Sequence, residues 1–172
     1  MTVLITGGAK CGKSHYAEDI FNGFIGKKYY IATMQPDGEE AQATIARHRA
    51  QREGKGFVTI EQYFDFTEVC VPEGSGMLLE CLGNLCANVL FGSHPKDTQE
   101  SICNGIRYLS EHAERLVIVT NQVGSDGIDY AEGTMRYMKL IGEINRYAAS
   151  LADVVVECVY GIPVIRKGIP LW

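Results

Sequence analysis

The sequence predicts an α/β fold: a mostly parallel sheet with helices on both faces and an antiparallel edge strand. Short apolar runs alternate along the chain with stretches of helical periodicity, which is typical of parallel sheets covered by helices. The runs at 117–119 and 154–156 are almost continuously apolar and indicate strands buried on both faces. Because 172 residues suffice for one domain with a sizeable core, we expect a single domain over 1–172.

Strands are recognised here by short apolar runs rich in β-branched residues, and helices by longer stretches with 3.6-residue periodicity. The first half has a strand at 2–6, a helix at 13–24, a strand at 27–33, a helix at 38–53, a strand at 57–61, a shorter helix at 62–70 and a strand at 76–81. The second half has helices at 82–92 and 98–113, a strand at 115–121, a helix at 130–151 and a strand at 152–160. A last strand at 160–168 follows a Gly turn, and Pro163 indicates an edge position because proline lacks the backbone N–H that a central strand needs.

Composition excludes several functional classes. The net charge of −5 argues against a general nucleic-acid binder. The chain contains no run of eighteen apolar residues, so no membrane span is expected. The N-terminus lacks the basic region and cleavage site of a signal peptide, so we expect a cytoplasmic protein. The six cysteines form neither CxxC nor zinc-ligand spacing and are expected to be reduced and structural, with Cys70, Cys81 and Cys158 as small core residues.

The strongest motif follows the first strand and opens the first helix. "GGAKCGKS" fits the phosphate-loop pattern G-x-x-x-x-G-K-S over Gly7, Gly8, Ala9, Lys10, Cys11, Gly12, Lys13 and Ser14. In this pattern small residues let the backbone N–H groups approach a phosphate, and the helix N-terminus adds positive potential. Lys13 is expected to reach the β- and γ-phosphates and Ser14 to supply an oxygen to Mg²⁺. The motif therefore predicts binding of a nucleoside triphosphate.

A phosphate-loop enzyme usually needs an acid at the end of a second apolar strand, to hold the water shell of the metal ion. Glu80 in "MLLECL" occupies that position, directly after three apolar residues and before a helix. Its alternative interpretation is an acid at a strand end that simply faces solvent. We favour the metal role, so Ser14 and Glu80 are the predicted Mg²⁺ residues.

The segment "TIARHRAQREGKGF" (44–57) places one histidine among four cationic side chains. On a helix, His48 shares a face with Ile45, Gln51 and Arg52, and Arg49 lies beside it. The arginines could hold a phosphate chain against a neutral imidazole, as a nucleophile that attacks phosphorus requires. A solvated basic helix face would give the same pattern, and the residues alone favour that interpretation.

Motifs spread over nearly the whole chain resemble one family. They are "LITGGAKCGKS" (4–14), "YYIAT" (29–33), "IARHRAQR" (45–52), "TIE" (59–61), "LLECLGNLCANVLF" (78–91), "VIVTNQVG" (117–124), "INRYAASLADVV" (144–155) and "GIPVIRKG" (161–168). The chain is thereby similar to the bifunctional adenosylcobinamide kinase / adenosylcobinamide-phosphate guanylyltransferases of late cobalamin assembly. The phosphate loop is common to many enzymes, whereas the order of the later motifs is specific to this family.

The resemblance implies a RecA-like phosphate-loop core and a homotrimer whose neighbouring subunits complete the site. It implies that His48 is the residue guanylylated by GTP. It also implies substrates GTP, ATP and adenosylcobinamide, with Mg²⁺ as cofactor. The nucleotide site implied beyond the phosphate loop is Ala32, Thr33, Met34, Arg49, Ala50, Gln51, Arg52, Glu61 and Glu80.

Some positions depart from the family pattern, among them Gln122, Met138 and Lys139. Because they lie after residue 120, away from the GTP motifs, they concern substrate binding or the kinase half. They motivate a second hypothesis, an enzyme with only the kinase or only the guanylyltransferase activity. A third hypothesis is a GTP-binding regulatory module on the same fold, against which His48 argues because binding alone needs no histidine there.

Overall fold

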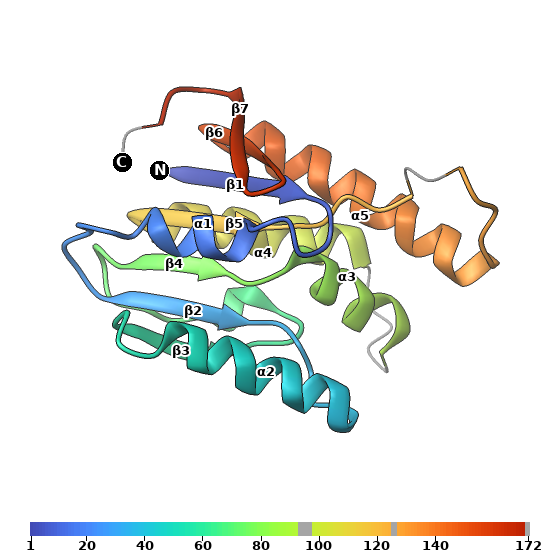
Figure 1. Ribbon diagram of the computed structural model, residues 1–172, viewed down its shortest axis with the longest axis horizontal. Coiled ribbons are helices and arrows are strands. Elements are labelled where there is room, and N and C mark those ends of the chain that lie inside the picture. Colours follow the sequence, from blue (N-terminus) through green and yellow to red (C-terminus); the bar gives the residue numbers. More distant parts are fainter. Residues whose placement is uncertain (93–97, 125–126, 171–172) are drawn as a thin grey trace.

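The computed structural model describes residues 1–92, 98–124 and 127–170, and it confirms the α/β class (Figure 1). Its seven strands are β1 (Thr2–Gly7), β2 (Lys28–Ala32), β3 (Phe57–Glu61), β4 (Gly76–Leu79), β5 (Arg115–Val119), β6 (Val154–Val159) and β7 (Ile162–Lys167). The helices are α1 (Lys13–Asp19), α2 (Gly38–Arg52), α3 (Leu82–Phe91), α4 (Thr98–His112) and α5 (Glu132–Leu151), with a 3₁₀ turn η1 (Phe66–Glu68).

One sheet contains all seven strands in the order β3-β2-β4-β5-β1-β6-β7. The neighbours from β3 to β6 pair in parallel, while β7 runs antiparallel to β6 at the edge. Pro163 lies in β7, so the prediction of an antiparallel edge strand is confirmed. Since the parallel strands all end on the same side, the residues that follow β1, β2, β3 and β4 come together at one edge.

Two hydrophobic cores lie on opposite faces of the sheet. Alternate residues of a strand point to opposite faces, and in β1 Leu4 packs into one core while Val3 and Ile5 pack into the other. The larger core is covered by α3, α4 and α5, and the smaller by α1 (Figure 1). Helices therefore cover both faces, as the apolar strands predicted.

Several helices and strands are shorter in the structure than the sequence predicted. The first helix ends at Asp19 and not at residue 24, because the chain turns at Asn22 and Gly23, where Gly23 has φ +77°. The segment 62–70 contains only η1, whose start is capped by the Asp65 side chain. The strand predicted to reach residue 121 ends at Val119.

The prediction for Cys70 was wrong, since this side chain is exposed. Its neighbour Val69 takes the buried position, and in extended chain the next side chain points the other way. Cys158 is buried as expected, and Cys81 is half-buried. All six cysteines are free.

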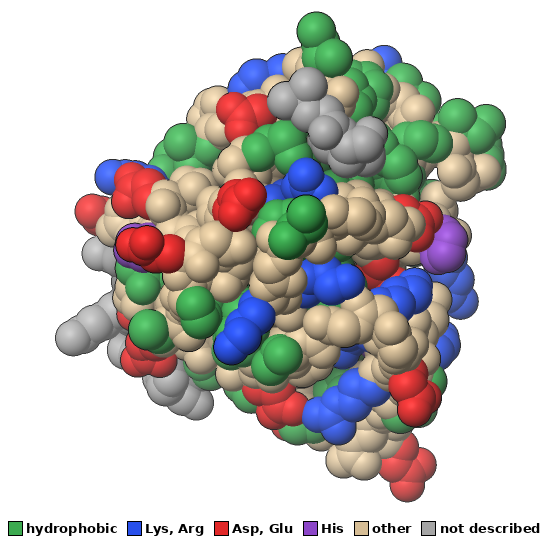
Figure 2. Space-filling model, turned by 90° about the vertical axis from the view of Figure 1, so that its left-hand side faces the viewer, with side chains coloured by type: hydrophobic (Ala, Val, Ile, Leu, Met, Phe, Trp, Pro, Cys, Tyr) green, Lys and Arg blue, Asp and Glu red, His purple; other side chains and the backbone are tan. Residues whose placement is uncertain are grey.

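Among the described residues no helix is both long and apolar enough to cross a membrane. Figure 2 looks at the face where the strands begin, and basic and acidic side chains are intermingled over the described part of it. The residues that the sequence singled out gather at the opposite edge, where the parallel strands end.

Candidate active site

The phosphate loop connects β1 to α1, and two of its glycines are required by its geometry. Gly7 has φ +146°, and a Cβ there would lie 2.5 Å from the carbonyl oxygen of Cys158. Gly12, with φ +95°, precedes α1. At Gly7 the chain thus approaches β6 with no room for a side chain, and at Gly12 the loop turns into the helix through a conformation that side chains disfavour.

Lys13 lies inside the phosphate loop. Its side chain is largely buried, at 7% exposure, and its Nζ donates to the carbonyl oxygen of Gly7 at 3.0 Å. An ammonium held at this point is placed for a phosphate that enters the loop. Ser14 follows it and is exposed.

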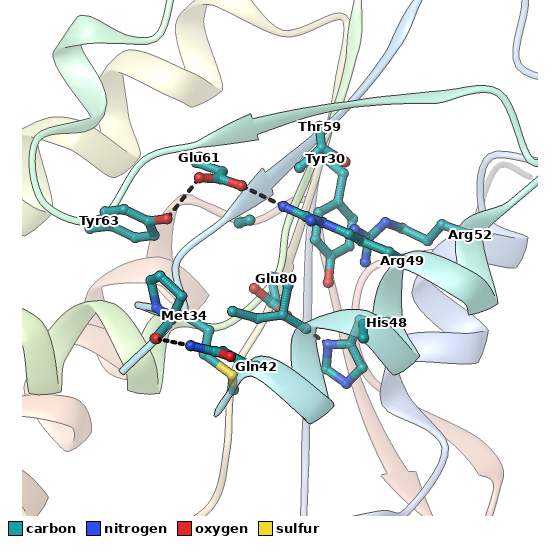
Figure 3. A pocket seen from close by; sticks show the side chains of 14 residues that line it. Tyr30, Met34, Gln42, His48, Arg49, Arg52, Thr59, Glu61, Tyr63 and Glu80 are labelled. Carbon is teal, nitrogen blue, oxygen red and sulfur yellow. Dashed lines mark hydrogen bonds and ion pairs between the residues drawn. The ribbon is translucent and has the colours of Figure 1, made fainter. Parts of the chain in front are cut away.

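His48 on α2 pairs with Glu80, which follows β4. The Nδ1 of His48 lies 2.7 Å from Oε1 of Glu80, and the two side chains are 23% and 8% exposed (Figure 3). The other carboxylate oxygen of Glu80, Oε2, accepts the backbone N–H of Thr33 at 3.2 Å. The contact joins residues that are 32 positions apart in the chain.

The pKa of Glu80 lies below its ordinary value. Burial raises this pKa, but the hydrogen bond and charge of His48, together with hydrogen bonds from Tyr30 and Thr33, more than offset burial. Glu80 is therefore ionised at neutral pH and can only accept hydrogen bonds. It follows that Nδ1 of His48 carries a proton in this contact, and the lone pair of a neutral ring lies on Nε2.

A pocket of about 220 Å³ opens beside His48 between α2 and the ends of β2, β3 and β4 (Figure 3). Glu61 lies on its wall and accepts hydrogen bonds from Arg49 at 2.6 Å and from the hydroxyl of Tyr63 at 2.9 Å. The pocket is smaller than the roughly 300–1,000 Å³ of typical small-molecule sites. It therefore suits one part of a nucleotide, such as the base.

Arg52 lines the same pocket. Its guanidinium carbon lies 3.3 Å from the centre of the Tyr30 ring, which is a cation–π contact. The side chain is 7% exposed, and its buried Nη1 has no hydrogen-bond partner in the described part of the protein. A buried N–H without a partner is costly, and the cation–π contact with Tyr30 offsets part of that cost.

A second hollow, of about 250 Å³, separates α2 from the phosphate loop. His48 lines both this hollow and the pocket, so it lies between the loop and the candidate base site. Arg47 faces the hollow and Arg49 the pocket, which places the two flanking arginines on different sides of the ring. This arrangement could hold a phosphate chain across the imidazole.

The structure brings together most of the residues that the sequence selected. The pocket is lined by Ala32, Met34, His48, Arg49, Arg52, Glu61 and Glu80, and Gln51 faces the hollow. Thr33 contributes through its backbone N–H to Glu80. Ala50 is exposed and lines neither space. The residues predicted beyond the phosphate loop therefore lie together with the exception of Ala50, whereas Gly8 and Ala9 of the loop line a different hollow.

The predicted site lacked seven of the residues that line the pocket: Tyr30, Pro36, Gln42, Ile45, Ala46, Thr59 and Tyr63. Tyr30 and Thr59 could have been found from strand alternation, because they precede Ala32 and Glu61 by two positions and so share their face. Tyr63 carries no such signal, since it follows the end of β3.

Glu80 was predicted to serve a metal ion. Both of its oxygens already accept hydrogen bonds from protein donors, Oε1 from His48 and Oε2 from Thr33. The described residues also contain no group of three His, Cys, Asp or Glu side chains placed to bind a metal ion. The geometry favours Glu80 as the partner of the imidazole, and its metal role stays a prediction.

Comparison with known proteins gives consistent results. The family model described as "Cobinamide kinase / cobinamide phosphate guanyltransferase" matches residues 3–165. The bifunctional adenosylcobalamin biosynthesis protein CobU of Escherichia coli (strain K12) is 30% identical over 183 residues, which cover 97% of this chain and 100% of that protein. The bifunctional adenosylcobalamin biosynthesis protein CobP of Pseudomonas aeruginosa is 30% identical over 174 residues, covering 99% and 100%.

Among solved structures, a protein from Pyrococcus horikoshii OT3 matches with a TM-score of 0.50 at 10% sequence identity. The match covers 98% of this chain and 86% of that one. At this identity the likeness concerns the fold alone.

Proposed function

This chain belongs to the cobinamide kinase / cobinamide phosphate guanyltransferase family, and on that premise we propose that His48 is its guanylylated residue. The chain is a kinase and a guanylyltransferase of cobalamin biosynthesis. It phosphorylates adenosylcobinamide and then transfers GMP from GTP to adenosylcobinamide phosphate. The observation that carries the role of His48 is its position between the phosphate loop and the base pocket, with Nδ1 held by Glu80.

In the guanylyl transfer, Nε2 of His48 attacks the α-phosphorus of GTP. A nitrogen–phosphorus bond forms, the bond from that phosphorus to the α,β-bridging oxygen breaks, and pyrophosphate leaves with the oxygen. Glu80 keeps the proton on Nδ1 and offsets the positive charge of the substituted ring. An oxygen of adenosylcobinamide phosphate then attacks the same phosphorus, and His48 leaves with its lone pair restored.

The α-phosphate is the part of GTP that must lie at His48, which orients the rest of the nucleotide. The base enters the pocket and the β- and γ-phosphates enter the phosphate loop. Arg49 and Arg52 are placed to stabilise the charge that develops on the transferred phosphate. Arg49 can exchange its partner Glu61 for phosphate at little cost, because that ion pair is largely exposed.

We propose Mg²⁺ as the companion of the triphosphate, with the exposed Ser14 hydroxyl as the oxygen that would hold it. When bound, the ion would screen the charge of the phosphate chain. Since Oε1 and Oε2 of Glu80 accept hydrogen bonds from His48 and Thr33, we propose that Glu80 orients the imidazole and does not hold the metal ion.

Through family membership, the proposal also includes ATP as a second nucleotide substrate, assembly into a homotrimer and a cytoplasmic location.

The departures at Gln122 and Met138 lie outside the pocket. Gln122 donates to Glu157 at 3.0 Å, and Met138 packs on Gly124, where a Cβ would lie 2.0 Å from its terminal carbon. Neither residue lines the pocket or the hollow beside His48, so these departures leave the proposed guanylylation site intact.

Labelled GTP tests the function directly. Label from the α-phosphate that becomes covalently bound to the protein is expected for the guanylyltransferase, and γ-label transferred to adenosylcobinamide is expected for the kinase. The appearance of only one of these labels would indicate a single-activity enzyme. If neither label moves in the presence of Mg²⁺ and adenosylcobinamide, the protein is a binding module and the proposal is wrong.

Lys13→Ala should weaken GTP binding at least tenfold. The substitution removes a charge-assisted contact to the phosphates, and such contacts contribute about 1.5–3 kcal/mol. Calorimetry measures the affinity, and a melting curve shows whether the fold survives. Lys139→Ala, an exposed lysine on α5, is the matched control and should bind GTP as the wild type does. Unchanged affinity in Lys13→Ala would mean that the loop does not hold the triphosphate.

Glu61→Gln should reduce the preference for GTP over ATP about tenfold. A carboxylate can accept both N–H donors on the guanine edge, whereas a glutamine offers one acceptor and opposes the second donor with its own NH₂ group. Competition between the two nucleotides for binding gives the ratio of affinities. Glu68→Gln on η1 is the control at an exposed carboxylate outside the pocket. An unaltered preference in Glu61→Gln would remove Glu61 from base recognition.

A further inference from the structure

A third hollow lies on the other side of the phosphate loop from His48. Its volume is about 610 Å³, within the range of small-molecule sites, and it is bounded by residues 8–12 of the loop, Gln122, Glu157 and the turn between β6 and β7. The strand order places it here, because β6 flanks β1 on the side away from β4 and β2. Lys10, Cys11 and Gly12 line this hollow and also the one next to His48.

The turn between β6 and β7 consists of Tyr160 and Gly161, and it is attached to the phosphate loop. The N–H of Gly161 donates to the carbonyl oxygen of Cys11 at 3.0 Å, and a Cβ on Gly12 would lie 3.3 Å from the Cα of Gly161. The turn therefore lies beside the loop that follows β1 (Figure 1).

Tyr160 is unusual in two ways. Its φ is +51°, a conformation that a bulky residue rarely adopts and that Asn, Asp or Gly would fill with less strain in such a two-residue turn. Its side chain is 95% exposed, so burial of the ring does not compensate the strain. A strained backbone that presents an uncovered aromatic ring beside a phosphate site indicates a ligand contact.

We propose that this third hollow binds the base and ribose of a purine nucleoside triphosphate, the phosphoryl donor of the kinase step. The base stacks on Tyr160, and the hydrogen-bonded pair of Gln122 and Glu157, which Arg166 also contacts, forms the polar wall of the hollow. The inference rests on the proposed function, since it assigns the second activity of the same enzyme. The volume suits a nucleoside and not a corrinoid macrocycle with its adenosyl group.

The two reactions need opposite directions of the phosphate chain. Guanylylation needs the α-phosphorus at His48, with the base in the pocket lined by Glu61 and the outer phosphates in the loop. Phosphorylation needs an exposed γ-phosphorus. A nucleotide with its base on Tyr160 runs through the loop the other way and presents its γ-phosphate on the side of Ser14 and His48.

In that orientation the alcohol oxygen of the acceptor forms a bond to the γ-phosphorus. The bond from this phosphorus to the β,γ-bridging oxygen breaks, the nucleoside diphosphate leaves with that oxygen, and the alcohol proton passes to solvent. Both nucleotides occupy the same phosphate loop, so they exclude each other.

Tyr160→Asn tests the proposal. Asparagine accepts the positive φ of the turn while removing the ring, and Tyr160→Phe keeps the ring. In a His48→Asn background, which prevents covalent reaction, β,γ-imido-ATP should bind about tenfold more weakly to the Tyr160→Asn variant and with unchanged affinity to the Tyr160→Phe variant. Calorimetry gives both affinities.

The same substitution with His48 intact provides the second measurement. Formation of the GMP adduct at saturating GTP should change less than twofold in Tyr160→Asn, and about tenfold more β,γ-imido-ATP should be needed to inhibit it. If the wild type forms no adduct, the proposed function fails and not only this inference. If the adduct forms but the analogue binds Tyr160→Asn as tightly as wild type, the inference is wrong.

Two other results would also overturn the inference. Weaker binding of adenosylcobinamide with unchanged binding of the analogue would make the third hollow an acceptor site. Loss of an oligomer on gel filtration, with unchanged binding of the analogue, would make Tyr160 an interface residue.

Discussion

His48→Asn should abolish the GMP adduct completely. Wild-type protein mixed with GTP and Mg²⁺ should gain one GMP mass per chain, because Nε2 of His48 is the proposed attacking atom. Intact-protein mass spectrometry measures the adduct, which should be labile in acid and stable in alkali, as a phosphoramidate is. The side chain is partly exposed and contributes little to the core, so the variant should fold and still bind GTP.

Two variants serve as controls for this result. His112→Asn removes a histidine on α4 that stacks on Tyr108, and it should retain the full adduct. Arg49→Ala should slow adduct formation without preventing it, because Arg49 stabilises phosphate charge and does not form the bond. Full GMP label on His48→Asn would make His48 a bystander on a basic helix, and the guanylyltransferase mechanism would need another nucleophile.

Glu80→Ala should lower the rate of adduct formation by a factor on the order of 10²–10⁴, the range seen when the carboxylate partner of a catalytic histidine is lost. Without Glu80 nothing in the contact holds the proton on Nδ1 or offsets the charge of the substituted ring. Glu80→Gln should be similarly slow, since its NH₂ can donate to Nδ1 and favour the tautomer with Nε2 protonated. Rapid quench at saturating GTP gives the rate.

Two measurements distinguish a role of Glu80 in orienting the His48 ring from a role in ordering Mg²⁺. If Glu80 ordered Mg²⁺, raising the Mg²⁺ concentration should restore part of the rate in Glu80→Gln, and we expect no restoration. Nitrogen chemical shifts of the His48 ring report the tautomer independently of turnover. Glu18→Gln is the matched control, because Glu18 is equally buried and pairs with Lys55 outside the site. Wild-type rates in both Glu80 variants would refute the role.

Glu80→Ala should also lose stability, by about 1–3 kcal/mol, because the buried N–H of Thr33 loses its acceptor. Burial raises the pKa of Glu80, but the hydrogen bond and charge of His48, with smaller effects of Tyr30 and the Thr33 N–H, lower this pKa by more. The contribution of Glu80 to stability is therefore present at neutral pH. That contribution is lost as the pH falls through the folded-state pKa, which lies below the ordinary value. The difference in melting temperature between wild type and Glu80→Ala should therefore narrow in acid.

Local patterns in the sequence predicted the fold class and the chemistry. The apolar runs placed all seven strands within a few residues, and the motif from Gly7 to Ser14 lies between β1 and α1, where a phosphate loop is expected. Pro163 placed β7 at the edge. The strand predictions are confirmed because the two-residue period of a strand and the missing N–H of proline act over a few neighbouring residues.

The sequence by itself therefore determined the elements, the phosphate loop, the presence of His48 on a helix and, through its motifs, the family. Only the tertiary structure decided that Glu80 contacts His48 across 32 positions, that Tyr30 and Thr59 line the pocket, and that the turn at Tyr160 lies against the phosphate loop. The physical reason is that strand order and helix docking depend on how the whole chain buries its two cores. That packing determines which residues become neighbours in space, and the spacing of residues along the chain does not reveal those contacts.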